Sequence, residues 1–334
     1  YEKLYCEMDK RLIFSKVIFF SVALCNVGWT RFQQNALLER GVSIRDVGIL
    51  KGIGLLFKIF GELWCCVVAD KHDPVKVFIF CACVQAYTLE AIRSATTLSF
   101  NYVLYIKFLR GLTACLPTLT NALCCALTAG TKEGYGQQRV YGSLAWGIGA
   151  LLTGGLIDNY GTQAMFFFAY VFYGLSALLV YFGNRILLLE NLHSPVANKA
   201  SSDNLSNVSL TPTFRAQSIT QYVSLLTAEV YKLITQFKES VKRLLFHDSL
   251  KYLLLNILIY GSCMTITDSI YSTLLITEYK TSAFYGGMYT GMGVLSCLPA
   301  FYLSNGLIAK HGHYKLLAFA EASAVVRFVI NSML

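Results

Sequence analysis

The stretch GILKGIGLLFKIFGELW, residues 48–64, is apolar enough for the centre of a membrane-spanning helix, yet it contains Lys51, Lys58 and Glu62. On an α-helix with about 100° per residue, Lys58 and Glu62 each lie about 20° from Lys51, on opposite sides of it. The three charges therefore form one stripe. Because an ionisable side chain at mid-bilayer costs roughly 2.5–3.5 kcal/mol, this stripe requires either a partner or a function.

Two interpretations of the stripe stay open at the level of sequence. In the first, Lys58 and Glu62 form an i,i+4 ion pair, although the order with lysine first is the weaker one, and Lys51 extends its ammonium group to the membrane interface. In the second, the stripe faces an aqueous pathway through the protein.

The rest of the chain has the composition of an integral membrane protein. Of its 334 residues, 55% are hydrophobic and 14% are charged, and the mean hydropathy is +0.52, whereas roughly a quarter of the residues in a soluble domain are charged. Motifs of zinc proteases, nucleotide-binding loops and serine hydrolases are missing, so the sequence does not indicate an enzyme. None of the eleven cysteines has CxxC spacing, and we expect no metal centre, disulfide framework or cofactor.

Nine stretches are long and apolar enough to cross the roughly 30 Å hydrocarbon core as helices. They predict an all-α integral membrane fold in two halves, with a short N-terminal segment (residues 1–11), a six-helix half (12–182), a linker (183–249) and three helices of a second half (250–334). The expected spans are residues 12–32, 47–69, 75–93, 101–124, 140–157, 164–182, 250–276, 284–308 and 315–334.

The linker is polar, but between about residues 219 and 245 apolar residues recur at helical spacing among lysines. This pattern predicts an amphipathic helix, either on the membrane surface or against the ends of the spans. With a cytosolic N-terminus and linker, most basic residues fall on the cytosolic side. We therefore interpret the formal net charge of +9 as a topology signal, with the excess basic residues in contact with anionic lipid. We expect no nucleic-acid partner. The other side then holds only Arg31, Arg40, Arg45, Arg93 and Lys280.

The sequence repeats itself at an offset of 239 residues without a gap. Gly48-x-x-x-Gly52 and its copy Gly287-x-x-x-Gly291 predict small helix faces on which a neighbour can pack closely. The second span therefore corresponds to the eighth, and six helices per half predict three more spans beyond Leu334. The matching pairs are Glu39/Glu278, Ser43/Ser282, Gly48/Gly287, Gly52/Gly291, Gly54/Gly293, Lys71/Lys310, His72/His311 and Lys76/Lys315.

Two related six-helix halves joined by a long cytosolic linker resemble the major facilitator superfamily of secondary transporters. Three segments are similar to its MFS-1-like branch, which contains relatives of nucleoside–proton and sugar–proton symporters. These segments are GVSIRDVGIL (residues 41–50), YGQQRVYGSLAWGIGALLTGGLID (135–158) and GHYKLLAFAEASAVVRF (312–328). The resemblance covers nearly the whole chain.

The superfamily's loop between spans two and three reads Gly-x-x-x-Asp-Arg/Lys-x-Gly-Arg/Lys-Arg/Lys. Here it is CVVADKHDPV, residues 66–75, which keeps Asp70 and Lys71 but loses the glycines and the basic pair. Its copy, NGLIAKHGHY, residues 305–314, keeps Lys310 and Gly312 and has Ala309 at the acidic position. The resemblance implies that these residues form a conformational latch, and the erosion of the motif motivates an alternative to transport.

The fourth-span motif of the superfamily, Arg-x-x-Gln-Gly-x-Gly, appears here with Lys107 at the arginine, Arg110 at the glutamine and Gly111 retained. The resemblance implies that spans one, four and seven line a central cavity, which favours Lys107, Arg110 and Asp268 as lining groups. On the first span, Asn26, Trp29 and Gln33 could add hydrogen bonds and stacking, although Trp29 could instead be an interface anchor. The other candidates along the pathway are Lys51, Lys58, Glu62, Glu90, Glu321 and Arg327, of which Glu90 lies closer to the outer rim.

Glu321 and Arg327 are six residues apart, so we expect each to pair across helices rather than with the other. An excess of positive charge in a shared cavity would attract an anionic solute or lower the pKa of a nearby carboxyl group. Glu62 and Asp268 are the candidates for a coupled proton. We predict a secondary active or facilitative transporter of a small polar or anionic solute that works by alternating access. The alternative is a transport-inactive scaffold that serves as a structural or assembly subunit of a membrane complex.

Overall fold

The computed structural model describes residues 10–128, 135–193 and 278–333, and a few single positions between 231 and 260. The chain divides into two compact units, of which one is Ser194–Ser269 and the other is Tyr1–His193 with Ile270–Leu334. Every regular element within the described ranges is an α-helix. The helices are α1 (Lys10–Leu38), α2 (Ile44–Lys71), α3 (Pro74–Ser94), α4 (Phe100–Leu112), α5 (Leu116–Thr128), α6 (Tyr135–Tyr160), α7 (Gln163–His193), α11 (Ala283–His311) and α12 (His313–Met333).

Six spans among the described residues are long and apolar enough to cross a membrane: Arg11–Leu38, Ile44–Ala69, Pro74–Ser94, Phe100–Thr128, Gly136–Tyr160 and Gln163–Arg185. They confirm the six expected spans of the first half, most of them lengthened by a few residues. Helices α11 and α12 cover the expected eighth and ninth spans but are not among these six. The expected seventh span and the amphipathic helix of the linker lie outside the described residues.

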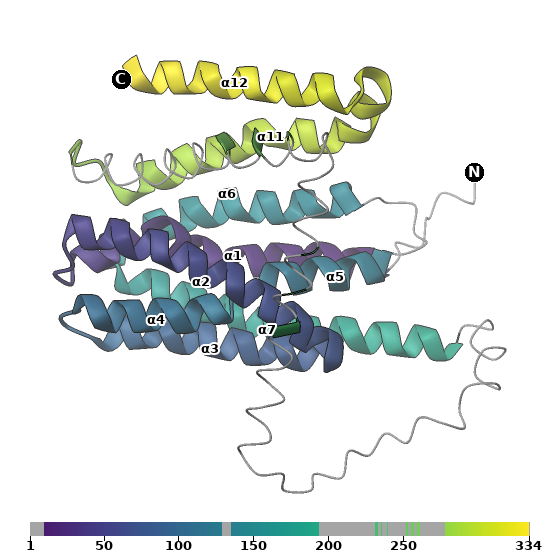
Figure 1. Ribbon diagram of the computed structural model, residues 1–334, viewed down its shortest axis with the longest axis horizontal. Coiled ribbons are helices and arrows are strands. Elements are labelled where there is room, and N and C mark those ends of the chain that lie inside the picture. Colours follow the sequence, from purple (N-terminus) through teal and green to yellow (C-terminus); the bar gives the residue numbers. More distant parts are fainter. Residues whose placement is uncertain are drawn as a thin grey trace, which may run out of the picture. The chain divides into compact units, whose positions relative to one another are not determined.

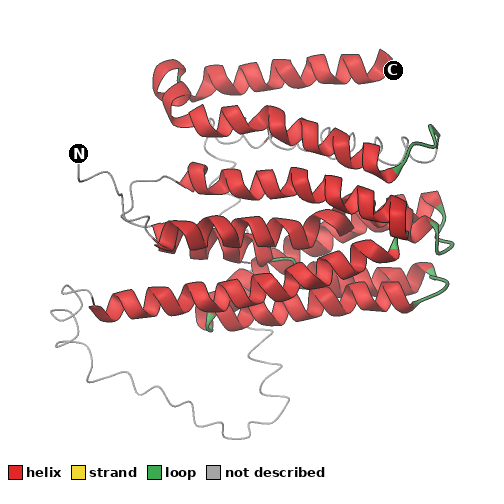
Figure 2. Cartoon of the chain, turned by 180° about the vertical axis from the view of Figure 1, so that it is seen from behind, coloured by secondary structure: helices red, strands yellow, loops and turns green. Residues whose placement is uncertain are grey.

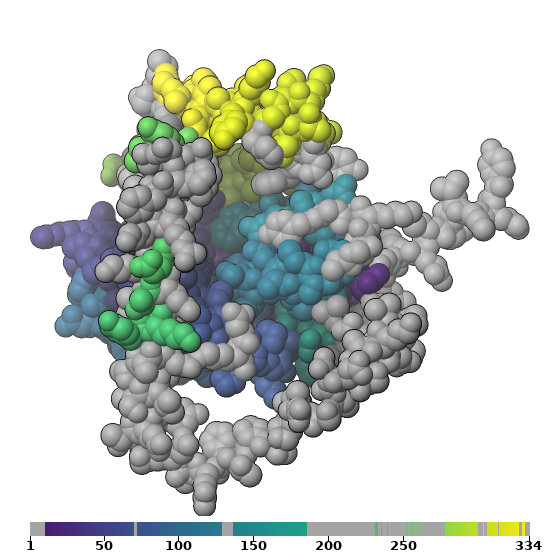
Figure 3. All heavy atoms as spheres, turned by 45° about the vertical axis from the view of Figure 1, so that its right-hand side comes forward, coloured from purple at the N-terminus to yellow at the C-terminus, as the bar shows by residue number. Residues whose placement is uncertain are grey.

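Within the larger unit the helices lie side by side, with their axes running roughly along one direction (Figure 1). Helix α1 packs against α5, α6 and α7, α3 packs against α7, and α2 packs mainly against α4. On the other side α6 packs against α11, and α12 contacts α11 at the edge of the described helices (Figures 2 and 3). Of the membrane-spanning windows, that of α1 is 56% buried and that of α2 only 17%, so α2 has the least covered surface of the six.

The fourth span is broken into α4 and α5, and Pro117 explains the break. A proline ring clashes with the carbonyl group four residues before it, here that of Thr113, and the chain leaves the helix at Thr113 and re-enters it at Leu116. The break frees the carbonyl group of Arg110, which accepts a hydrogen bond from Gln85 Nε2 at 2.8 Å instead. Gln85 Nε2 also donates to Thr113 Oγ1 at 3.1 Å. The proline therefore places Arg110 and Cys115 at an irregular point inside the bundle.

Helices α6 and α11 approach each other closely because glycines lie at their contact. A Cβ atom on Gly154 would lie 2.5 Å from the carbonyl oxygen of Ala283, and one on Gly287 would collide with the carbonyl oxygen of Ala150. The predicted small face at Gly287 and Gly291 is thus confirmed. At Gly48 and Gly52 an added Cβ would meet no described atom within 4 Å, so the corresponding face of α2 has no partner among the described residues.

Candidate functional site

Trp29, on α1, is 4% exposed and lies inside the bundle, where two cations contact its ring. Lys107 Nζ lies 5.7 Å and Arg110 Cζ lies 5.4 Å from the ring centroid. Both cations come from α4 and are spaced i,i+3, so they project from the same helix face. A cation within about 6 Å of an indole ring is attracted by its π-electrons. Trp29 is thus buried against the two cations of α4, and we call Trp29, Lys107 and Arg110 the cation–tryptophan centre.

Lys107 is buried, with 9% of its surface exposed. Its ammonium group donates to Gln33 Oε1 at 2.5 Å, and Gly54 of α2 lies beside its aliphatic stem, since an added Cβ would be in ordinary van der Waals contact with Lys107 Cδ at 3.4 Å. Arg110 and Lys51 are both close enough to repel its charge. Within the described ranges, the salt bridges join Lys58 to Glu62 and Arg93 to Glu90, and none neutralises Lys107 or Arg110. The centre is therefore positive.

Arg110 is held by α3 and α7. Its Nη1 donates to the carbonyl oxygen of Gln85 and to Thr88 Oγ1, both at 3.3 Å, and its Nη2 donates to the hydroxyl group of Tyr173 at 3.1 Å. The Tyr173 hydroxyl in turn donates to Asn26 Oδ1 at 3.2 Å. A guanidinium group has five N–H donors, so these three bonds orient it and leave donors for a further acceptor. The predicted candidates Asn26 and Arg110 thus belong to one network.

The charged stripe on α2 divides into two parts. Lys58 and Glu62 lie 3.6 Å apart as an i,i+4 salt bridge, with side chains 51% and 34% exposed. This is the ion pair of the first interpretation. The positive charge of Lys51 acts on Lys107. Of the stripe, Lys51 therefore adds its charge to the cation–tryptophan centre.

The remaining sequence candidates lie elsewhere. Asp268 is outside the described residues. Glu321 and Arg327 are both on α12, and Glu321 is partly buried. Helix α12 contacts α11, and none of its described residues takes part in the hydrogen bonds or cation–π contacts given above for the cation–tryptophan centre.

The latch candidates Asp70 and Lys71 lie at the end of α2, and Lys310 and Gly312 lie at the end of α11. Gly312 ends α11 with φ 77° and ψ 162°, a conformation that is essentially confined to glycine. At the equivalent place after α2, Asp73 has φ −61°, and its side chain accepts a hydrogen bond from Val75 N at 2.9 Å as the cap of α3. The lost glycine of the first motif is thus replaced by an Asp-Pro turn that does not need it.

Glu90 forms a second polar group near the opposite end of α3. Arg93 donates to both of its carboxylate oxygens, at 2.5 and 2.7 Å, and Tyr170 donates to it at 2.8 Å. In the α1–α2 loop, Arg40 donates to the carbonyl oxygen of Ala36 at 2.8 Å. Burial lowers the pKa of Arg40 from its ordinary value, and the carboxylate of Glu39 partly offsets this effect. Glu90 and Arg40 are thus both held by hydrogen bonds within the chain.

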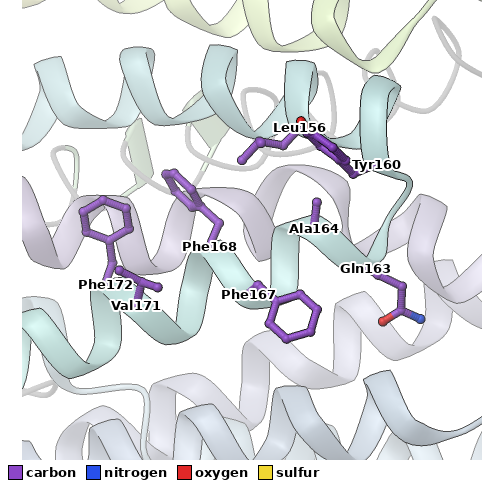
Figure 4. Close-up of a pocket in the computed structure, with 8 residues that line it drawn as sticks. All are labelled: Leu156, Tyr160, Gln163, Ala164, Phe167, Phe168, Val171 and Phe172. Atoms are coloured by element: carbon purple, nitrogen blue, oxygen red, sulfur yellow. The ribbon is translucent and has the colours of Figure 1, made fainter.

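An open pocket of about 460 Å³ lies at the surface between α6 and α7. Figure 4 shows that aromatic and aliphatic side chains surround it, among them Tyr160, Phe167 and Phe172. None of the described residues that line it is charged. It is therefore unsuited to an anionic solute, in contrast to the cation–tryptophan centre.

Sequence reasoning missed several residues of the site. Gln85 and Thr88 stand out weakly, as polar residues in the apolar run of α3, whereas Tyr173 is one of 21 tyrosines and has no distinguishing signal. Asp158, at the end of α6, was also missed. Its carboxylate accepts hydrogen bonds from Ala283 N at 2.8 Å and Phe284 N at 2.9 Å, and so caps α11 from another helix.

A family profile described as the MFS_1 like family matches residues 18–334. The chain belongs to this family. Its members are transporters of the major facilitator superfamily, and the resemblance inferred from the sequence is confirmed. The MFS_1 like chain is thus an integral multi-pass membrane protein of a transporter family.

The fold of the MFS_1 like chain is similar to that of the nucleoside transporter NupG, as seen in a crystal structure of a mutant of that protein. The TM-score is 0.56 at 16% sequence identity, and the match covers 90% of this chain and 69% of that one. A comparison with curated protein sequences gives no match. The likeness to NupG establishes the fold alone, so the solute must be inferred from the site.

Proposed function

We propose that this MFS_1 like protein moves a small polar or anionic solute by alternating access, and that the cation–tryptophan centre binds the solute. The observation that carries the proposal is the pair of cations on Trp29, for which the described residues supply no counter-ion. An uncompensated buried charge is costly. A bound anion would offset that cost.

The chemistry of the centre favours a carboxylate or phosphate group joined to a flat ring or another apolar part. The donors that Arg110 and Lys107 keep after their internal bonds match the oxygens of such an anion. Trp29 offers its ring for stacking and van der Waals contact. Gln33 and Asn26 hold the two cations from α1, Asn26 through the hydroxyl group of Tyr173, which fixes their positions before a solute arrives and lowers the entropy cost of binding.

Uptake by the purified full chain in proteoliposomes tests this proposal. We expect Arg110→Ala and Lys107→Ala each to reduce transport of an anionic solute at least tenfold, because each removes charge-assisted hydrogen bonds worth about 1.5–3 kcal/mol. Tyr173→Phe removes one hydrogen bond to Arg110 and should cost less. Arg185→Ala is the matched control, because Arg185 is an exposed cation whose Nη2 donates to the Tyr181 hydroxyl. Undiminished transport in both Arg110→Ala and Lys107→Ala would remove these residues from the mechanism.

Proton coupling is a further part of the proposal. Glu62 is paired with Lys58, which leaves Asp268 of the expected seventh span as the better candidate for a carboxyl group that changes protonation during the cycle. Solid-supported-membrane currents across a pH gradient measure this coupling. We expect Asp268→Asn to abolish proton-driven current while Glu62→Gln retains it, and the reverse outcome would transfer the role to Glu62.

The proposal includes nine spans in this chain, with the N-terminus and the linker in the cytosol. The basic residues of the linker and of the loops after α2 and α11 support this orientation. Labelling of single introduced cysteines at positions 45 and 132 from each side of the membrane would test it. If position 132 is labelled from the extracytosolic side, the topology is the reverse of the one proposed.

A transport-inactive scaffold that assembles with other membrane-protein subunits is the second candidate. The Asp73–Pro74 turn favours it, because it replaces the glycine of the family's latch motif. Co-purification with other membrane proteins in fixed stoichiometry, together with no solute flux in proteoliposomes, would support the scaffold over the transporter.

A further inference from the structure

Three buried thiol groups from separate parts of the chain meet inside the bundle. Cys65 comes from α2, Cys81 from α3, and Cys115 from the break between α4 and α5, and each is at most 5% exposed. The Sγ atoms of Cys65 and Cys81 lie 3.9 Å apart, those of Cys81 and Cys115 lie 3.5 Å apart, and all three lie within 4.8 Å of one another. We propose that these cysteines form a binding site for a soft metal ion, with Cu(I) favoured by the donor set.

The size of the sulfur triangle fits a single ion. With a metal–thiolate bond of about 2.3 Å, three sulfur ligands in a plane around one ion lie about 4 Å from one another. The observed separations differ from this value by less than 1 Å. Rotation of the side chains therefore suffices to complete the site, and the three helices do not have to move.

The kind and number of ligands favour Cu(I) over other metal ions. Thiolate ligands select Cu(I) and Zn(II) over hard cations such as Mg²⁺ and Ca²⁺. Structural zinc sites are almost always four-coordinate, whereas no His, Asp or Glu of the described ranges joins these three cysteines. Three sulfur ligands without a fourth suit the lower coordination number of Cu(I). Binding releases thiol protons as the thiolates form.

Thiolates in this apolar environment depend on the metal ion for charge compensation. The positive charge of a bound ion offsets their negative charge. In the structure the Cys65 thiol donates to the carbonyl oxygen of Leu112, with its Sγ at 3.0 Å, and the Cys115 thiol donates to Cys81 Sγ at 3.5 Å. Metal–sulfur bonds replace these two hydrogen bonds as the thiol protons are released.

Anaerobic titration of the reduced full-length chain in detergent with Cu(I), against a chromophoric Cu(I) chelator, tests the proposal. We expect one tightly bound Cu(I) per chain, and X-ray absorption spectra of that sample with three sulfur neighbours at about 2.3 Å. Cys65→Ser, Cys81→Ser and Cys115→Ser should each weaken binding at least tenfold, a loss on the order of that seen for altered metal sites. A parallel titration with Zn(II) should show weaker binding.

Cys124→Ser is the matched control, because Cys124 is also fully buried but lies apart from the triangle, with its Sγ 3.7 Å from the carbonyl oxygen of Ser15. It should keep Cu(I) binding. The X-ray absorption spectrum is recorded on the unmutated protein, so this part of the test does not depend on whether a variant folds. Absence of stoichiometric Cu(I) binding, nitrogen or oxygen neighbours in the spectrum, tighter binding of Zn(II), or retained binding in a Cys65→Ala/Cys81→Ala/Cys115→Ala variant would each overturn the site.

Discussion

Helices α2 and α11 are two copies of one sequence repeat, but they are used differently. In α11, Gly287 and Gly291 lie against α6, and the helix N-terminus is capped by Asp158 of α6. In α2, the equivalent glycines contact no described atom, and the helix is capped by its own Ser43, whose Oγ accepts from Asp46 N at 3.1 Å. The second copy is therefore bound to the first half, while the first copy leaves one face uncovered by the described residues.

The difference shows that the repeated residues determine how each helix is built and packed. The candidate function depends instead on residues that occur in only one of the two copies. The shared serines and glycines start each helix and provide a small face. The charged stripe of α2 has no counterpart in α11. Its residues Lys51, Lys58 and Glu62 correspond to Thr290, Cys297 and Phe301 of α11. Lys51 adds its charge to the cation–tryptophan centre, so the first copy contributes to the candidate site and the second contributes to the contact between halves.

Substituting equivalent glycines should give effects of opposite sign, and the effect in α11 is the largest that we expect. Gly287→Ala places a methyl group against the backbone of Ala150, which cannot rotate away, and overpacking of this kind costs about 3 kcal/mol. Gly48→Ala meets open space and gains up to about 1 kcal/mol from helix propensity. Titration with SDS in mixed micelles measures both free energies of unfolding. Equal losses in the two variants would show that α2 also has a close partner at Gly48.

The turns after the two helices should respond differently when their residues are exchanged. Gly312→Asp forces a side chain into the backbone conformation at φ 77°, at a cost of about 2 kcal/mol. Asp73→Gly keeps an allowed φ and replaces an N-cap by glycine, which costs only a few tenths of a kcal/mol. The same SDS titration compares them. A small effect of Gly312→Asp would mean that the turn after α11 can adopt the Asp-Pro geometry of the first copy.

The sequence predicted the six spans of the first half because each is a long apolar run, and a buried helix in a membrane needs little else. It also predicted the close contact at Gly287, and the ion pair between Lys58 and Glu62 was one of the two interpretations that it left open. These features depend on spacing along one helix or on a motif.

The rest of the site could not be predicted, because it depends on which helices become neighbours. Nothing local marks Tyr173 as a partner of Arg110 or places Cys65, Cys81 and Cys115 together. The cap of α11 was missed for the same reason: Ser282 has the position and residue type of an N-cap, but its side chain makes no capping bond, and the bond comes from a helix more than a hundred residues earlier.

The two helix caps give the next smaller effect. Asp158→Ala removes the carboxylate from the amide groups of Ala283 and Phe284 and should cost about 1 kcal/mol, as for other helix caps. Ser282→Ala should change the free energy of unfolding by less than about 0.5 kcal/mol, since its side chain caps nothing here. Thermal unfolding followed by size-exclusion chromatography ranks the variants. A larger loss from Ser282→Ala than from Asp158→Ala would contradict the assignment of the cap.

The salt bridge between Lys58 and Glu62 should contribute least. Its side chains are partly exposed, and an i,i+4 pair in water is worth about 0.3–0.5 kcal/mol. A double-mutant cycle with Lys58→Met and Glu62→Gln measures this coupling by SDS titration. A coupling of several kcal/mol would show that the pair faces lipid or another helix rather than water, because either surrounding raises the cost of separating the charges.

Two side chains at the start of α11 have the type of a helix cap: Asp158 of α6, which accepts the capping bonds, and Ser282, which makes none. Ser282 has φ −67° and ψ 156°, almost the same backbone angles as the capping residue Ser43 at −66° and 152°, so only its side-chain torsion separates it from a capping geometry. A serine N-cap accepts from the second or third amide group of its helix, so Ser282 can take over the bond of Phe284 N but not that of Ala283 N. Separation of α6 from α11 therefore deprives Ala283 N of its acceptor, and the cap couples the start of α11 to the position of α6.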